Sequence, residues 1–230
     1  AGGNVYAVGS IYGGYDYGTA TYDFGGGVTA TVTTPYAPVL VKYDSSGAPR
    51  WARTATSGNR SSSSGLRSVV VDAGGNVYAA GKLSGGSYDF GEGVTVTTSL
   101  AVVLVKYDSL GVPRWARTII AGNRLSESHY LSVAADGGGN EYAAGYLFRE
   151  DSYDFGAGVT AAVTTPYAPV LVKYDSSGSA QWARTATTGE SYFGEVAVDA
   201  GGNVYAAGNI AGSGRCDFGG GVTATGTAEN

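Results

Sequence analysis

The chain has 230 residues and a net charge of −5, with 14 Lys and Arg against 19 Asp and Glu. It has no basic cluster, which argues against nucleic acid binding, and no run of about 18 apolar residues that could span a membrane. Cys216 is the single cysteine, so no intrachain disulfide can form. Gly reaches about twice its usual share, and Val, Thr and Tyr are abundant, which predicts an all-β fold with many tight turns.

A repeat of about 64 residues organises the chain. Its most regular part is residues 72–81, Asp-Ala-Gly-Gly-Asn-Val-Tyr-Ala-Ala-Gly, where a Gly-Gly-Asn turn precedes a strand. The run returns with small changes at residues 136–145 and 199–208, and in part at residues 1–7. An Asp-Phe-Gly tripeptide also recurs in every repeat, around Phe24, Phe90, Phe155 and Phe218.

Each complete repeat contains four strand candidates. The first is rich in Val, Ala and Ser, the second follows the Gly-Gly-Asn turn, the third is Val-Leu-Val-Lys-Tyr, and the fourth contains Trp between charged residues. The first strands are predicted at residues 69–71, 132–134 and 196–198, and the third at 39–43, 103–107 and 170–174. Four antiparallel strands per repeat without a helix are typical of a β-propeller blade, although a β-solenoid could use the same hairpins.

Two connections are also patterned. Asp44-Ser45-Ser46-Gly47 joins the third and fourth strands, and we expect Asp44 to cap that turn while Gly47 takes a left-handed conformation. The longer connection at residues 87–97 predicts a short extra hairpin that places Phe90 in the gap between neighbouring units.

The predicted units are residues 1–68, 69–132, 133–195 and 196–230. The two middle units are whole, whereas the first lacks its inner strand and the last lacks its outer two. The chain begins at Ala1 without a signal peptide, so we expect a mature product or a piece of a longer protein. Unpaired strand edges invite association, so we also expect a homo-oligomer or membership of a longer propeller.

The recurring run Val-Leu-Val-Lys-Tyr-Asp-Ser-Ser-Gly, Trp-Ala-Arg and Val-Val-Asp-Ala-Gly-Gly-Asn-Val-Tyr-Ala-Ala-Gly resembles the bacterial SBBP-type β-propeller repeat family. The resemblance covers nearly all of the chain. It implies a propeller fold and a location at the bacterial cell surface or outside the cell. The family shares no catalytic residues, so it implies none here. Cys216 departs from the Tyr-Asp-Phe pattern of the other units.

Motifs that resemble catalytic or metal-binding signatures have structural explanations. Asp-Phe-Gly occurs in kinases, but here it is repeated and lacks the partner motifs of a kinase. The aspartates at Asp44 and Asp72 could bind Ca²⁺, yet each turn offers one carboxylate, which favours turn capping. We therefore predict no catalytic residues, no metal and no cofactor.

The loops that differ between repeats are the candidates for partner recognition. Loops from the fourth to the first strand and from the second to the third strand should share one face. Exposed Tyr and Arg suit contact with protein or glycan. The predicted partner-binding residues are Tyr12, Tyr15, Tyr17, Arg60, Arg124, His129, Tyr130, Tyr192 and Phe193, whereas Tyr36 and Tyr167 are expected to pack their own loops.

These patterns predict a non-enzymatic β-propeller scaffold or protein-interaction module. One alternative is a lectin-like propeller that binds carbohydrate. A second alternative is an enzyme that acts on polysaccharides in a central channel, which would require acids or His at the channel mouth.

Overall fold

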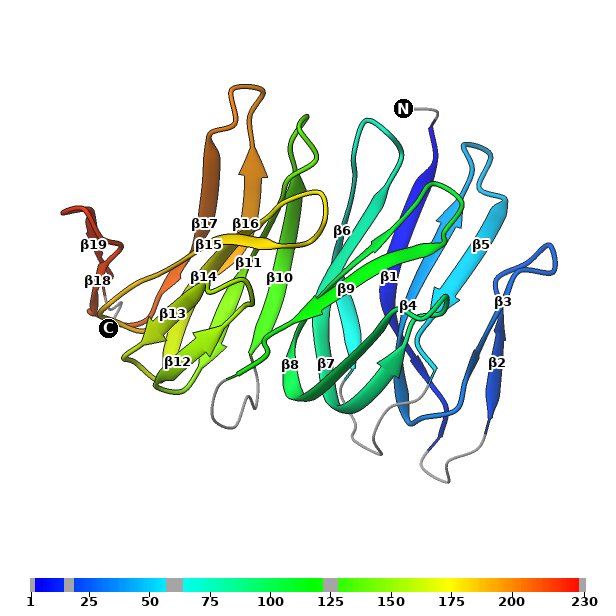
Figure 1. Ribbon diagram of the computed structural model, residues 1–230, viewed down its shortest axis with the longest axis horizontal. Coiled ribbons are helices and arrows are strands. Elements are labelled where there is room, and N and C mark those ends of the chain that lie inside the picture. The colour runs from blue at the N-terminus through cyan, green and yellow to red at the C-terminus, as the bar shows by residue number, and fades with distance from the viewer. Residues whose placement is uncertain (1–2, 15–18, 57–63, 122–127, 228–230) are drawn as a thin grey trace.

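The computed structural model describes residues 3–14, 19–56, 64–121 and 128–227. All regular structure in these residues is β-strand, arranged in small antiparallel sheets (Figure 1). The predicted all-β class is therefore confirmed. No helix in these residues is long and apolar enough to cross a membrane.

Two four-stranded sheets form the middle of the molecule. We call them sheet two and sheet three, and in each the strands pair in chain order. Sheet two contains β6 (Gly65–Val71), β7 (Val77–Asp89), β8 (Thr95–Tyr107) and β9 (Pro113–Thr118). Sheet three contains β10 (His129–Ala135), β11 (Glu141–Phe148), β14 (Tyr167–Tyr174) and β15 (Ala180–Thr185). The four predicted strands of each middle repeat are thus present and antiparallel.

The flanking sheets have fewer strands in the described part of the chain. Sheet one contains β1 (Val5–Tyr12), β4 (Tyr36–Tyr43) and β5 (Pro49–Thr54). Sheet four contains β16 (Ser191–Val198) and β17 (Val204–Ile210). Among the described residues, sheet one has no equivalent of β6, and sheet four has none of β8 and β9.

The four sheets lie side by side in a row (Figure 1). β6 contacts β1 and β10, and β10 contacts β16, so the first strands of successive sheets are neighbours. Small serines connect them: the Val133 amide donates to Ser68 Oγ at 3.1 Å, and the Val196 amide donates to Ser132 Oγ at 3.1 Å. The Val, Ala and Ser composition of these strands permits this close approach.

Each unit contains a short hairpin, and in units two, three and four it bonds to the preceding unit. These hairpins are β2 (Ala20–Asp23) with β3 (Thr29–Val32), β12 (Asp151–Asp154) with β13 (Thr160–Val163), and β18 (Arg215–Asp217) with β19 (Thr223–Thr225). In sheet two the hairpin is continuous with β7 and β8. Thr56 and Asp89 exchange two backbone hydrogen bonds at 2.8 and 2.9 Å across units one and two. Phe90 is buried in the cluster that contains Ala55 and Leu66, which confirms its predicted place between units.

The first strands begin earlier than predicted. β6, β10 and β16 start at Gly65, His129 and Ser191, so the predicted unit boundaries fall inside these strands. A register shift after Leu66, Tyr130 and Phe193 interrupts the alternation of apolar residues that marks a strand. At this bulge the chains approach closely, since a Cβ at Gly145 would lie 1.8 Å from the His129 carbonyl oxygen. This close approach leaves no room for a side chain, so each Ala-Ala-Gly run ends in glycine.

Candidate binding site

One position of the repeat carries a different residue in every unit. The residue after the glycine of the second strand is Ser10, Lys82, Tyr146 or Asn209. Across the strand pair, Gly65 faces Lys82, His129 faces Tyr146, and Tyr192 faces Asn209. We call these seven residues the variable strip. They line two pockets, one between sheets one and two and the other between sheets three and four.

The pocket between sheets three and four is aromatic. It has a volume of about 390 Å³, and Tyr146, Tyr167 and Tyr192 contribute rings to its wall. The Tyr146 ring lies 5.8 Å from the Tyr167 ring and 6.3 Å from the Tyr192 ring, measured between centroids. Tyr167 and Tyr192 are 38% and 41% exposed. Glu190 and Asn209 add hydrogen-bonding groups to the same wall, so the pocket offers both flat apolar faces and polar atoms.

His129 connects the aromatic pocket with its neighbour. Its ring stacks on the Tyr146 ring at 5.4 Å, and its side chain also lines the pocket between sheets one and two. Burial, together with the positive charges of Lys82 and Arg67, lowers the pKa of His129 to about 4. His129 is therefore neutral at pH 7 and can both donate and accept a hydrogen bond.

The second pocket is basic. It has a volume of about 460 Å³ and contains Lys82 and Arg67 beside His129 and Ser10. Lys82 is only 7% exposed, so its ammonium group acts in a partly desolvated setting. This concentration of positive charge in a chain of net charge −5 suits an anionic group of a ligand.

Buried serines hold the strand ends that carry the strip. The Phe148 amide donates to Ser128 Oγ at 3.0 Å, and the Tyr153 hydroxyl donates to the Phe148 carbonyl oxygen at 2.6 Å. In unit four Cys216 replaces this tyrosine, and its Sγ donates to Ser191 Oγ at 3.4 Å. The strip is thus built on anchored strands rather than on free loops.

The structure brings two of the predicted site residues, His129 and Tyr192, onto the strip. Tyr130 and Phe193 lie in the same two strands, but their rings pack in or against core clusters rather than on the strip. Tyr130 is fully buried and its hydroxyl bonds that of Tyr174 at 2.9 Å, whereas Phe193 is half-buried and stacks on Phe218 at 6.0 Å. Successive side chains of a strand point to opposite faces, so Tyr130 points into the core while its neighbour His129 lies on the strip.

The remaining predicted site residues lie elsewhere. Tyr12 packs its ring against Tyr36 at 4.9 Å, and its backbone is held by the Tyr22 hydroxyl, so this ring supports its own unit. Tyr167 makes the equivalent contact with Phe148 at 4.8 Å but also lines the aromatic pocket. Tyr15, Tyr17, Arg60 and Arg124 lie outside the described residues.

Sequence reasoning missed Arg67, Lys82, Tyr146, Glu190 and Asn209. The signal for three of them was present, because the residue after Ala-Ala-Gly changes from Lys82 to Tyr146 to Asn209 while its neighbours repeat. The prediction searched the loops, whereas these positions lie in strands.

The aspartate turns have the capping geometry that the sequence predicted. Asp44 Oδ1 accepts hydrogen bonds from the Ser46 amide at 2.8 Å and the Ala48 amide at 3.0 Å. Hydrogen bonds from the Ser46 hydroxyl and the Ala48 amide lower the pKa of Asp44 to about 2. Among the described residues, no three His, Cys, Asp or Glu side chains are grouped as metal ligands.

Comparison with known proteins does not add a relative. No protein-family model matches the chain, and no curated protein sequence matches it.

Proposed function

We propose that this chain is a non-enzymatic β-propeller scaffold that binds an acidic carbohydrate along its variable strip. The aromatic pocket between sheets three and four carries the proposal. Three tyrosine rings surround a space of about 390 Å³, and Glu190 and Asn209 lie at its wall. Aromatic faces pack against the C–H faces of a sugar ring, while carboxylate and amide groups bond its hydroxyls.

The concave shape favours carbohydrate over a protein partner. Small ligands occupy pockets with apolar walls and a few polar groups, whereas protein interfaces need a wider surface. The aromatic pocket occurs between one pair of sheets, so the proposal predicts one principal site per chain rather than one per repeat.

The adjacent basic pocket supports an acidic ligand. Lys82 and Arg67 lie beside His129, which stacks on Tyr146 of the aromatic pocket. A sugar chain seated on the tyrosines would extend its carboxylate or sulfate groups toward these cations. Binding should therefore weaken as salt concentration rises.

Calorimetric titration of the purified chain tests the proposal. Oligogalacturonates and sulfated oligosaccharides should bind more tightly than neutral oligosaccharides of the same length. Tyr192→Ala should weaken binding at least tenfold by removing one ring of the pocket, a loss of about 1.4 kcal/mol. Arg67→Ala should reduce binding of the acidic ligands and leave that of neutral ones unchanged.

Tyr205→Ala is the matched control, because Tyr205 is exposed and also lies in sheet four but does not line the aromatic pocket. Equal losses from Tyr192→Ala and Tyr205→Ala would contradict the proposed site. A chain that binds none of these oligosaccharides at millimolar concentration would contradict the carbohydrate ligand itself.

The proposal includes the propeller architecture. Its support is the pair of four-stranded antiparallel sheets, the contact of successive first strands and the hairpins that link each unit to the one before. Membership of the SBBP-type repeat family and a location at the bacterial surface or outside the cell remain proposals based on the recurring residues. Cell fractionation with an antibody to the chain tests the location.

Assembly belongs to the same proposal, either with a second copy of this chain or within a longer propeller.

A further inference from the structure

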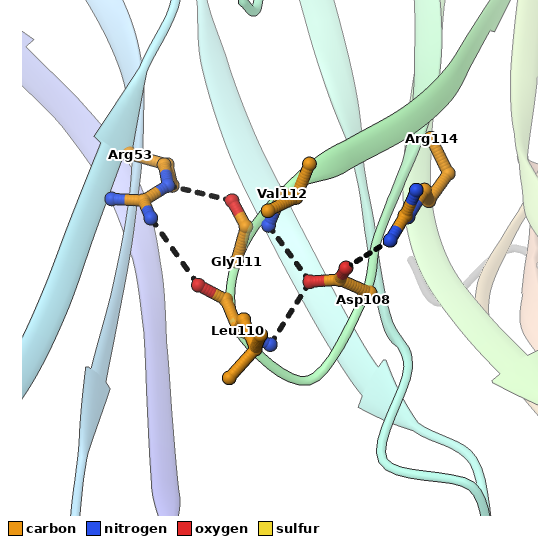
Figure 2. A network of polar contacts seen from close by, with 6 residues as sticks. All are labelled: Arg53, Asp108, Leu110, Gly111, Val112 and Arg114. Atoms are coloured by element: carbon orange, nitrogen blue, oxygen red, sulfur yellow. Dashed lines mark hydrogen bonds and ion pairs between the residues drawn. The ribbon is translucent and has the colours of Figure 1, made fainter. Parts of the chain in front are cut away.

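A recurring set of one Lys, one Trp and one Arg, which we call the grip, joins unit one to unit two and unit two to unit three. Arg53 of unit one donates through Nε to the Gly111 carbonyl oxygen at 2.6 Å and through Nη2 to the Leu110 carbonyl oxygen at 3.3 Å (Figure 2). Lys42 donates to the Ser109 carbonyl oxygen at 3.1 Å. Asp108 caps this turn through the Leu110 and Val112 amides, so its carbonyl groups are held toward the preceding unit (Figure 2).

A tryptophan completes the grip. A Cβ placed on Gly111 would lie 2.9 Å from the Trp51 ring, so only glycine lets the turn reach that ring. The arrangement repeats between units two and three, where a Cβ placed on Gly178 would lie 2.8 Å from the Trp115 ring. There Arg117 Nε donates to the Gly178 carbonyl oxygen at 2.7 Å and Lys106 donates to that of Ser176 at 3.1 Å. Each grip therefore consists of one Lys, one Trp and one Arg.

Unit three carries the same grip without a turn on it. Lys173 lies over the Tyr142 ring at 5.5 Å, and the Arg184 guanidinium lies over the Trp182 ring at 5.5 Å. The corresponding distances in unit one are 5.6 Å for Lys42 over Tyr6 and 5.3 Å for Arg53 over Trp51. The third grip is thus arranged like the other two, but no turn of the described chain lies against it.

The matching turn is at the opposite end of the row. Residues 44–47, Asp-Ser-Ser-Gly, are identical to residues 175–178, which the second grip holds. Ser45, Ser46 and Gly47 are exposed, and a Cβ on Gly47 would meet no atom within 4 Å. Arg50 pairs with Asp44 at the base of this turn, at 2.6 Å, but in the described chain no set of Lys, Trp and Arg from another unit lies against it.

We infer that Lys173, Trp182 and Arg184 of one chain grip the turn at residues 44–47 of a second copy. The contact is head-to-tail, because two different surfaces meet, and it can add further copies or close a ring. The inference rests on the proposed repeat architecture. It also affects one wall of the aromatic pocket, because β17 carries Asn209 and Ile210 of that wall.

One strand and the hairpin that follows it must give way to seat the turn in the same geometry. β1 of the incoming copy and β17 of the receiving copy are equivalent strands and would compete for the place beside β16. The hairpins β2–β3 and β18–β19 are also equivalent, so β18–β19 yields together with β17. β17 is the more exposed, with Tyr205 at 59%, whereas β1 buries Ile11 in its own core cluster. β17 therefore yields, and β16 pairs with β1 of the second copy. Because strand exchange is slow, samples must be incubated until their mass stops changing.

Two variants test the grip and the turn separately. Arg184→Ala disables the grip and leaves the turn intact. Gly47→Asn disables the turn for a partner while keeping its backbone, because Asn tolerates the φ of +82° that Gly47 adopts. The controls are Arg215→Ala, an exposed arginine of β18 whose side chain belongs to no grip, and Gly93→Asn, a turn glycine with φ of +76° and open space around it.

Light scattering over a range of concentrations provides the test. The wild-type chain and both controls should associate, whereas Arg184→Ala and Gly47→Asn should each weaken association at least tenfold. A mixture of the two variants should form a one-to-one dimer and stop there, since it holds one intact grip and one intact turn.

A monomeric wild-type chain, a monomeric mixture or unchanged association of the variants would overturn the inference. Near-ultraviolet circular dichroism establishes that each variant is folded before its mass is compared. Carbohydrate binding by Arg184→Ala should equal that of the wild type when both are diluted to the monomer, so failure of the assembly and failure of the carbohydrate site can be distinguished.

Discussion

Glu141 is the residue whose place in the repeat is hardest to reconcile with stability. The equivalent residues are Val5, Val77 and Val204, all at the start of the second strand. Glu141 is fully buried, and neither carboxyl oxygen has a hydrogen-bond partner of good geometry among the described residues. Burial raises the pKa of this carboxyl group to about 8 from its ordinary value of 4.5. A buried polar group without a partner costs about 1–3 kcal/mol.

Replacing Glu141 by valine should therefore stabilise the protein, and more so at higher pH. Between pH 4.5 and 8 the unfolded chain carries an ionised Glu141 while the folded chain keeps it protonated. The unfolded state thus binds fewer protons, so the free energy of unfolding falls as pH rises, by at most about 1.4 kcal/mol per pH unit from this group. Urea unfolding at pH 5, 7 and 9 should show Glu141→Val gaining on the wild type across this window.

Glu141→Gln serves as the control for that measurement. It removes the ionisation but keeps a buried polar group, so it should flatten the pH dependence without the full gain of the valine variant. If the wild type and Glu141→Val keep a constant difference from pH 5 to 9, the carboxyl group does not titrate as its burial requires.

At the scale of elements, the turn between the third and fourth strands has two structural roles. It closes a hairpin, and in units two and three its glycine also contacts the tryptophan of the preceding unit. Gly47 and Gly178 share nearly the same backbone, with φ of +82° and +79°, but only Gly178 faces a ring. Comparing substitutions at Gly47 and Gly178 therefore separates the effect of the contact between units from the effect of backbone strain in the turn.

Gly178→Ala should destabilise the chain more than Gly47→Ala. Both variants incur the strain of a positive φ, about 1 kcal/mol. Only Gly178→Ala also forces a Cβ against the Trp115 ring, which adds about 1–3 kcal/mol of overpacking. Thermal unfolding at low protein concentration measures the difference. Equal losses would show that the turn can withdraw from Trp115 without cost.

The strands were largely predictable because the same strand and turn patterns recur in each repeat. Alternating apolar residues and Gly-containing turns located the strands, and the recurring Phe90 position indicated a buried contact between units. The starts of the first strands were not predictable, since a bulge near Tyr130 breaks the alternation. The variable strip was missed for another reason: His129 and Tyr146 meet only through strand pairing, which residue order alone does not give.

For the whole molecule, the row of sheets implies uneven stability. In repeat architectures each unit is stabilised chiefly by its neighbours. Sheets two and three are each covered on both sides, whereas sheet four has one neighbouring sheet among the described residues. The burial of the equivalent tyrosines shows this difference, because Tyr78 and Tyr142 are 0% and 2% exposed whereas Tyr205 is 59% exposed.

Hydrogen exchange should therefore rise toward sheet four. In the described chain, β17 pairs along one edge with β16, whereas β7 pairs with β6 and β8. Local opening of β17 exposes little apolar surface, so its amides should exchange at least about a hundredfold faster than those of β7, a difference of roughly 3 kcal/mol in opening free energy. Mass spectrometry of exchanged Arg184→Ala, kept dilute to avoid association, measures this directly. Uniform protection from β7 to β17 would mean that the sheets open as one cooperative unit, and that the row gains its stability from contacts beyond nearest neighbours.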